Sequence, residues 1–227
     1  MFISPKQILV DFLRHRLTDP QARAEATNTE TFNGGSTDFS LTATSGSVQA
    51  ITEVSVDGVV QSKWEDYYID FQNEKVIFYS NTAAGSDNVS ITYKQGTTSW
   101  IYDDKARATL STSAFPRINI LLVAGAGERV GQFNSNIQSK PHFQIDIWTK
   151  ENQLFTINSH KYGNDSLAEY LGYQVTKAFE DYVSDLYPQF YNYQLLSVPR
   201  DMGYNAEMQC FHVVVEIQLN SIDAGES

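Results

Sequence analysis

Cysteine is nearly missing from this sequence of 227 residues, which contains only Cys210. A single cysteine cannot form a disulfide within the chain and has no second thiol with which to build a C-x-x-C metal or redox motif. Cys210 lies in an apolar run and is expected to be buried in a core. The sequence therefore excludes a fold held by disulfides and a cysteine-rich metal site.

Basic residues are also scarce. The chain has 16 Lys and Arg against 27 Asp and Glu, a net charge of −11. Residues 28–98 carry three basic and nine acidic side chains, and residues 99–227 carry nine and fifteen, so both halves are acidic. Because binding of a nucleic-acid backbone requires cations that neutralise phosphates, this composition argues against a nucleic-acid-binding protein.

Long apolar runs are missing as well. No stretch approaches the roughly 18 apolar residues of a membrane-spanning helix, and Met1–Lys6 lacks the basic start and apolar run of a secretion signal. A soluble, unsecreted protein is expected. With 41% apolar and 13% aromatic residues, the chain can form packed cores, and its length suits two modest domains.

The patterns that mark enzymes are weak. The four histidines have no histidine or cysteine three or four residues away, and adjacent acids such as Asp103-Asp104 and Glu180-Asp181 point in different directions on a strand or helix. His142 and Asp146 are four apart on a predicted strand and would be separated by roughly 13 Å. The four histidines, His15, His142, His160 and His212, are therefore interpreted as ordinary surface or core residues. The serines Ser111, Ser113 and Ser135 lack the context of a nucleophile elbow.

The segment Gly125–Gly131 invites comparison with the nucleotide-binding pattern G-x-G-x-x-G, because it follows an apolar strand. Its third glycine stands at position 131 instead of 130, and no helix follows.

The sequence thus offers no catalytic, metal-binding or cofactor-binding residue. A non-enzymatic role is expected, and an enzyme is the alternative.

Two helices are predicted from apolar residues at helical spacing. The first starts at Ser4-Pro5, which suit an N-cap and a first helical position, and ends at Asp19-Pro20. The second has Ser166 as its cap, with Glu169 three residues on, and ends before Pro188.

Between the helices the apolar period changes to two, which predicts short strands separated by turns. Asp57-Gly58 is the strongest hairpin signal, because a type I′ turn requires positive φ at both central residues. Residues 28–98 are thus predicted to form an inserted all-β, sandwich-like domain. The strands expected there are Phe39–Ala43, Val48–Val60, Tyr67–Phe71, Lys75–Tyr79 and Val89–Tyr93.

Residues 1–27 and 99–227 are predicted to form an α+β core. Its sheet is expected to be antiparallel, with about four strands and both helices on one face. The four strands are placed at Pro116–Ala124, His142–Thr149, Tyr191–Val198 and Cys210–Leu219.

A sheet of few strands has open edges, and closed rings of subunits can satisfy them by joining sheets edge to edge. The residues from Gly125 to Lys140 are interpreted as a long loop that reaches a neighbouring subunit. Arg129, Gln132 and Phe133 are its predicted contact residues.

Five segments, together with the first helix, form a pattern that is informative as a set. They are Phe115-Pro116-Arg117-Ile118, Phe143–Lys150, the helix from Leu167, Pro199–Met202 and Phe211–Ile217. These segments resemble the tail terminator, or tail completion, proteins of long-tailed bacterial and archaeal viruses. The resemblance covers the first helix and roughly residues 99–222.

This resemblance implies a virion structural protein of the phage neck, made in the host cytoplasm. It implies an α+β subunit that forms a hexameric ring at the head-proximal end of the tail tube, stops tube polymerisation and joins the tail to the head connector. Its partners would be copies of itself, the tail tube protein and connector proteins, while genomic DNA passes through without specific binding. No catalytic residue or cofactor comes with the family, and the β-sandwich insertion, absent from compact members, would lie on the outside of the ring.

Two alternatives stay open. The chain could be another neck or tail protein, such as a head–tail stopper or the tail tube subunit. In a different class, the insertion could be a carbohydrate-binding module whose aromatic platform is formed by Trp64, Tyr67 and Tyr68.

Overall fold

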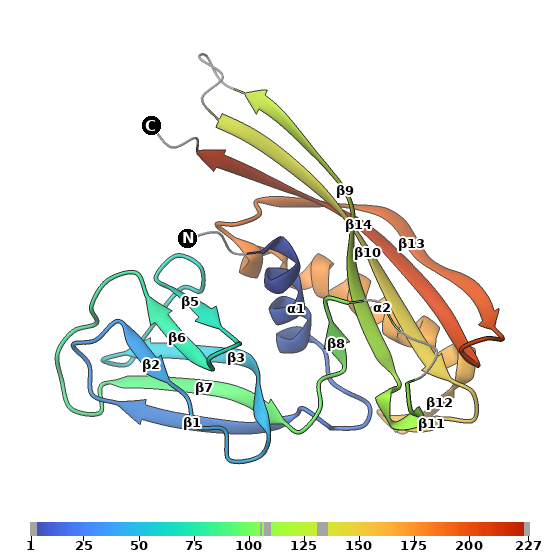
Figure 1. The fold of residues 1–227 in the computed structure, drawn as a ribbon, viewed down its shortest axis with the longest axis horizontal. Coiled ribbons are helices and arrows are strands. Elements are labelled where there is room, and N and C mark those ends of the chain that lie inside the picture. Colours follow the sequence, from blue (N-terminus) through green and yellow to red (C-terminus); the bar gives the residue numbers. More distant parts are fainter. Residues whose placement is uncertain (1–3, 105, 107–109, 131–135, 225–227) are drawn as a thin grey trace. The chain divides into compact units, whose positions relative to one another are not determined.

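A computed structural model describes residues 4–104, 106, 110–130 and 136–224. The chain divides into two compact units, one formed by residues 1–13 and 100–227 and the other by residues 14–99. Each unit is described separately below. The helices and strands of both are drawn in Figure 1.

The first helix, α1 (Pro5–Arg16), confirms the prediction from its cap and spacing. The carbonyl of Ser4 accepts hydrogen bonds from the backbone N–H groups of Gln7 and Ile8 at 2.9 and 3.2 Å, which starts the helical ladder. The apolar side chains at helical spacing, among them Phe12 and Leu13, are buried.

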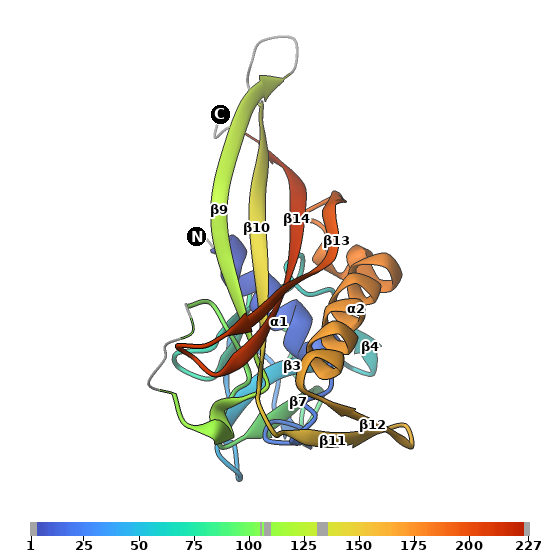
Figure 2. The ribbon, with the colours of Figure 1, turned by 90° about the vertical axis from the view of Figure 1, so that its right-hand side faces the viewer.

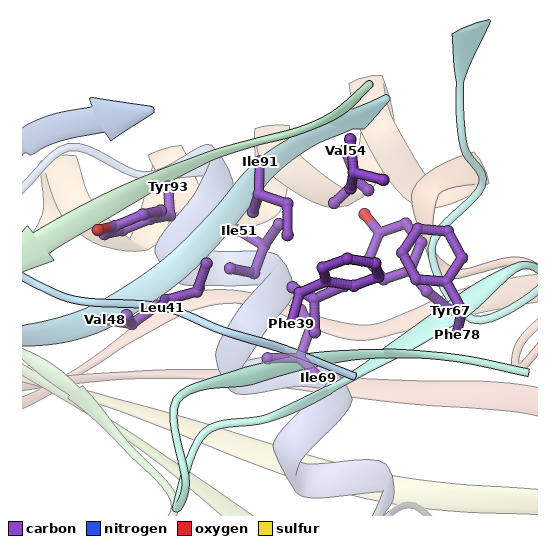
Figure 3. Packing of buried hydrophobic residues seen from close by; sticks show 12 residues of the cluster. Phe39, Leu41, Val48, Ile51, Val54, Tyr67, Ile69, Phe78, Ile91 and Tyr93 are labelled. Atoms are coloured by element: carbon purple, nitrogen blue, oxygen red, sulfur yellow. The ribbon is translucent and has the colours of Figure 1, made fainter. Parts of the chain in front are cut away.

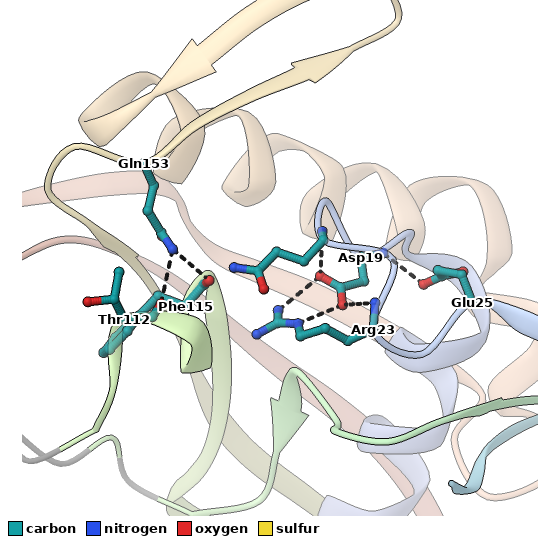
Figure 4. A network of polar contacts seen from close by, with 7 residues as sticks. Asp19, Arg23, Glu25, Thr112, Phe115 and Gln153 are labelled. Carbon is teal, nitrogen blue, oxygen red and sulfur yellow. Dashed lines mark hydrogen bonds and ion pairs between the residues drawn. The ribbon is translucent and has the colours of Figure 1, made fainter. Parts of the chain in front are cut away.

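The chain leaves α1 through a turn that the buried carboxylate of Asp19 organises (Figure 4). It accepts hydrogen bonds from the backbone of Gln21 at 3.0 Å and from the backbone and guanidinium of Arg23 at 2.8–2.9 Å. The N–H of Asp19 donates to Glu25 at 2.7 Å. The helix thus ends at Arg16, shortly before the predicted Asp19-Pro20, and the bonds of the buried Asp19 carboxylate hold the turn that follows.

The larger unit contains a five-stranded sheet in the order β13-β14-β10-β9-β8. The four long strands pair antiparallel, as predicted, whereas the short β8 pairs parallel to β9 and was not predicted. The strands are β8 (Ile101–Tyr102), β9 (Arg117–Val130), β10 (Asn136–Lys150), β13 (Asn192–Asn205) and β14 (Cys210–Ala224).

The long loop predicted between Gly125 and Lys140 is wrong, because most of this segment belongs to β9 and β10. The two strands pair out to Val130 and Asn136, and Asn136 also pairs with Ala224 of β14. Backbone hydrogen bonds to β9 and β14 therefore keep β10 extended on both sides. The sequence of this segment shows no alternation of apolar residues that would have predicted a strand.

The segment from Pro199 to Tyr204 was expected to separate two strands. This prediction is wrong, because the segment continues β13. Strand β13 is the last strand of the sheet and contains three register shifts between Leu195 and Gly203. An edge strand with bulges tolerates proline, whose missing N–H then costs no ladder hydrogen bond.

The second helix, α2 (Asn164–Tyr182), packs against β10, β13 and β14 (Figure 2). It begins two residues before the predicted cap, and Ser166 bonds back to Gly163, accepting from its N–H at 3.2 Å and donating to its carbonyl at 2.7 Å. The rings of Phe12 in α1 and Phe179 in α2 lie 5.1 Å apart. The unit is thus α+β, with helices packed on an antiparallel sheet.

Smaller elements complete this unit. They are β11 (Leu154–Ile157), β12 (His160–Gly163) and the short 3₁₀ turns η1 (Thr112–Ala114) and η2 (Val183–Leu186). The β11–β12 hairpin was not predicted, and its side chains are mostly exposed. The amide of Gln153 donates to the carbonyls of Thr112 and Phe115, both at 3.0 Å, and holds the η1 segment (Figure 4).

The smaller unit contains two antiparallel sheets, in the orders β1-β7-β3-β4 and β2-β6-β5. Most of its strands lie where alternation predicted them. Strand β1 was missed because its residues are largely polar and exposed. The strands are β1 (Ala26–Phe32), β2 (Asp38–Ser40), β3 (Ser47–Val56), β4 (Val59–Val60), β5 (Tyr67–Asp70), β6 (Lys75–Phe78) and β7 (Val89–Gly96).

One apolar cluster is shared by the two sheets of this unit (Figure 3). Side chains from β3 and β7 meet side chains from β2, β5 and β6, and all are buried. The labelled members are Phe39, Leu41, Val48, Ile51, Val54, Tyr67, Ile69, Phe78, Ile91 and Tyr93. Burial of this cluster is the main term that favours folding of this unit.

The Asp57-Gly58 hairpin is confirmed. Ser55 pairs with Val60 and Val56 with Val59, and the φ angles of Asp57 and Gly58 are 51° and 77°. Both central residues are therefore left-handed, as a type I′ turn requires.

Replacing Gly58 with alanine should destabilise the protein, because a Cβ penalises left-handed φ even though no atom lies within 4 Å of it. The expected loss is about 1–2 kcal/mol. Denaturant unfolding followed by circular dichroism measures it. The control Gly58→Asn should lose less, since asparagine tolerates this conformation, and equal stability of the alanine variant would contradict the strained turn.

Candidate assembly surface

The five-stranded sheet has two open edges. Strand β13 is its last strand on one side, and β8 covers β9 only at Ile118 and Asn119. Among the described residues, β10 is the one strand that pairs with β9 beyond Asn119, and no strand pairs with the outer side of β13. Backbone N–H and C=O groups along these edges can pair with another strand.

Apolar side chains are exposed along both edges. Leu122 and Val123 of β9 are 50% and 54% exposed, and Val198 of β13 is 71% exposed. Leu196 and Met202 of β13 are also exposed. Single exposed apolar residues are common, but here they gather beside unpaired backbone on both edges, which favours association with another sheet.

The sheet also continues past the end of α2, where β9, β10 and β14 extend together (Figure 2). The pairing of Val130 with Asn136, and of Asn136 with Ala224, marks the outer end of this three-stranded extension. In this view no helix formed by the described residues of the larger unit lies over the extension.

The structure describes one of the three residues predicted to contact a neighbour. Arg129 lies in β9, where its backbone pairs with Ile137. Gln132 and Phe133 lie outside the described residues, so the predicted contact set stays a prediction. The sequence did not single out Leu122 and Val123, because successive apolar residues are equally typical of a strand that is buried on both faces.

The face of the sheet that carries Asp146 holds a polar network. The Nε2 atom of His212 lies 2.9 Å from Oδ1 of Asp146, to which the amide of Gln144 also donates at 2.8 Å. The imidazole stacks on Trp148, with ring centroids 3.7 Å apart and planes 5° apart. His212 is more than 60 residues away from Asp146 and Trp148 in the sequence. The pairing of β10 with β14, which places Trp148 opposite His212, brings the three side chains together.

A second polar cluster fixes the segment before β9. The guanidinium of Arg117 forms an ion pair with Asp104 and lies 3.6 Å from the centre of the Tyr102 ring. Asn119 donates to the carbonyl of Asp104 at 2.6 Å. The buried Arg117 is thus satisfied by partners within the same unit, which indicates a structural role.

The thiol of Cys210 is buried beside Phe115, Trp148 and Met208, as expected for core packing. It donates to the carbonyl of Met208 at 3.2 Å, and burial raises its pKa to about 11. The surroundings of this thiol thus indicate a packing role.

The remaining histidines lie in separate places. His142 is 3.7 Å from the carboxylate of Glu216, which also meets Arg200 at 3.5 Å, and His160 Nδ1 lies 2.9 Å from the carbonyl of Asn158. Within the described part of the chain, no three His, Cys, Asp or Glu side chains are grouped so that they could hold a metal ion.

His15 stands in a cationic environment. Burial, together with the nearby charges of Lys63, Arg16 and Lys94, lowers its pKa from 6.5 to about 3. The imidazole is therefore neutral in the folded protein at physiological pH.

The aromatic platform expected at Trp64, Tyr67 and Tyr68 is wrong as stated. Trp64 and Tyr67 are buried, and Tyr67 belongs to the apolar cluster shared by the two sheets of the smaller unit. Only Tyr68 is partly exposed.

No protein-family model matches this chain, and no curated protein matches it either. Among the described residues, no helix combines the length and apolar character needed to span a bilayer.

The shifted pKa of His15 should make stability depend on pH. Its folded pKa lies below its unfolded value of 6.5, so the unfolded chain binds the extra proton and the free energy of unfolding falls as the pH drops from about 6.5 toward 3. Urea unfolding of the wild type and of His15→Gln at pH 7.5 and 5 measures this. The wild type should lose more stability than the variant, and an identical loss in both would contradict the buried neutral imidazole.

The burial of Cys210 should protect it from alkylation. Iodoacetamide at pH 8 is expected to label the native protein far more slowly than the protein unfolded in guanidinium, because the native thiol is inaccessible and its pKa is about 11. Mass spectrometry measures both rates. Rapid uptake of one label by the native protein would contradict this placement.

Proposed function

We propose that this protein is a structural virion protein that forms a ring, a hexamer in the family it resembles, at the head-proximal end of a viral tail tube. The ring ends polymerisation of the tube and joins the tail to the head connector. The observation that carries this proposal is the pair of open, apolar edges on the five-stranded sheet. The viral setting rests on the sequence resemblance.

The edges support assembly because each leaves a row of backbone groups and apolar side chains that another copy can cover. A ring in which every copy presents β9 to one neighbour and β13 to the other satisfies all edges at once. The partners proposed on the two faces of the ring are the tail tube protein and the connector proteins.

The charge of the chain supports passage of DNA through the ring. A net charge of −11 gives a lumen that repels phosphates instead of binding them. At physiological salt this repulsion acts over about 8–10 Å, enough to keep DNA from adhering to the wall.

Within this proposal, residues 28–98 form an inserted β-sandwich domain. Support comes from the two sheets of the smaller unit, which share one buried apolar cluster. A module with its own core can be added to a connection without disturbing the sheet that assembles.

The purified protein should form a closed ring with the mass of six 25.6 kDa chains. Light scattering coupled to size exclusion gives the mass, and negative-stain microscopy gives the shape. Open-ended polymers would instead indicate a tail tube subunit, and a monomer at all concentrations would contradict ring assembly.

Charges on the open edges should break the ring. Val123→Lys and Val198→Lys each place an ammonium beside an edge, and burial of an unpaired charge in an interface is costly. Each variant is expected to shift the protein from rings to smaller species. The control Leu154→Lys changes an exposed residue of β11 and should keep the ring; equal assembly of all three variants would rule out these edges as the contact.

A further inference from the structure

The smaller unit contains an open depression of about 290 Å³ beside the end of β6. Its lining combines amides, carboxylates and the aromatic residues Phe78 and Tyr79, and the polar members include Gln61, Glu65, Asp66 and Asn81. This volume lies near the lower limit of small-molecule sites, which are about 300–1,000 Å³, and suits a single small polar ligand.

The first rim of the depression is held by a local turn. The N–H of Asp66 donates to the carbonyl of Ser62 at 2.9 Å, and the N–H of Ser62 donates to the Asp66 carboxylate at 2.7 Å. The N–H of Tyr79 then donates to the carbonyl of Asp66 at 3.1 Å, which ties this rim to the end of β6.

The second rim is anchored to a different part of the unit. The backbone N–H and the hydroxyl of Thr82 both donate to the carbonyl of Ser36 at 3.1 Å, and Asn88 donates to the carbonyl of Ala83 at 3.0 Å. Because both rims are fixed by backbone bonds, a ligand would not have to order the site on binding.

The Tyr79 ring provides an open aromatic face. Its side chain is 52% exposed, and it packs beside Tyr68, with ring centroids 5.5 Å apart and planes 38° apart. Tyr68 therefore supports the ring of Tyr79 within the smaller unit, while part of that ring stays available for contact with the apolar face of a ligand.

The polar groups define what such a ligand must offer. The carboxylate of Glu65 accepts hydrogen bonds, and the amide of Asn81 both donates and accepts. The amide of Gln61 already donates to the carbonyl of Val59 at 2.8 Å, which leaves its oxygen and a second N–H for a ligand. Residues 28–98 carry three basic and nine acidic side chains, so a phosphate or carboxylate ligand would be repelled. A ligand with several hydroxyl groups, a C–H face and no negative charge meets all of these conditions.

We propose that this depression binds a neutral sugar, whose C–H face stacks on Tyr79 and whose hydroxyls bond to Glu65, Gln61 and Asn81. The site differs from the platform predicted at Trp64 and Tyr67, which is buried. It is independent of ring assembly, because the depression is lined within one unit of one chain.

Saturation-transfer difference NMR of the full chain tests the site, using the methyl glycosides of glucose, galactose and mannose and free N-acetylglucosamine, each at about 10 mM to detect millimolar affinities. At least one neutral sugar should receive saturation. Tyr79→Ala should weaken its binding at least about tenfold, whereas Tyr79→Phe keeps the ring and should bind like the wild type. The control Tyr173→Ala removes an exposed tyrosine of α2 and should not change binding.

Three results would overturn the proposal. The first is no transfer to any of the four sugars, and the second is equal binding by a folded Tyr79→Ala variant, with folding checked by circular dichroism. The third is loss of saturation transfer when a chelator is added, which would show that the carboxylates bind a divalent cation. N-acetylneuraminic acid, an anionic sugar, should bind more weakly, and binding as tight as that of the neutral sugars would contradict the role of the acidic surroundings.

Discussion

The register of strand β10 is the constraint on which the larger unit depends. Pairing of β10 with β9 and with β14 places Phe143, Ile145 and Ile147 on one face, where all three are fully buried. The same register places Asp146 and Trp148 on the opposite face, beside His212. A slip of one residue would exchange the faces and bury Asp146 in the apolar core, so the alternation of apolar residues fixes the sheet.

A sheet organised around its centre has a weakness at its edges. The two inner strands, β10 and β14, have partners on both sides, whereas β9 and β13 each leave one side open. The alternation that forms the centre is visible in the sequence, whereas the exposure of Leu122 and Val123 is seen only in the structure, where Val123 lies at the register shift between β9 and β10. Which residues lie at an edge depends on which strand is outermost in the sheet. The outermost strand is in turn determined by pairing between strands that are far apart in the sequence.

Local signals predicted local structure well. The Asp57-Gly58 turn and the start of α1 at Pro5 are each set within a few residues, and both are confirmed. The segment from Gly125 to Lys140 was misread because its extended conformation comes from pairing with β14, about 80 residues later. The depression at Tyr79 was missed for the same reason: one of its rims is held by bonds from Thr82 to Ser36, which are far apart in the sequence.

The directions of the edge strands bear on how copies can join. Four successive antiparallel strands leave β13 and β9 running in opposite directions. A neighbour related by rotation about a ring axis can therefore pair its β13 with β9 and continue the antiparallel order. A two-fold pair through β9 alone would also be antiparallel, but it would leave Val198 and the rest of the β13 edge uncovered. Because both edges carry exposed apolar side chains, head-to-tail joining covers more apolar surface per copy, and such joining ends only when the ring closes.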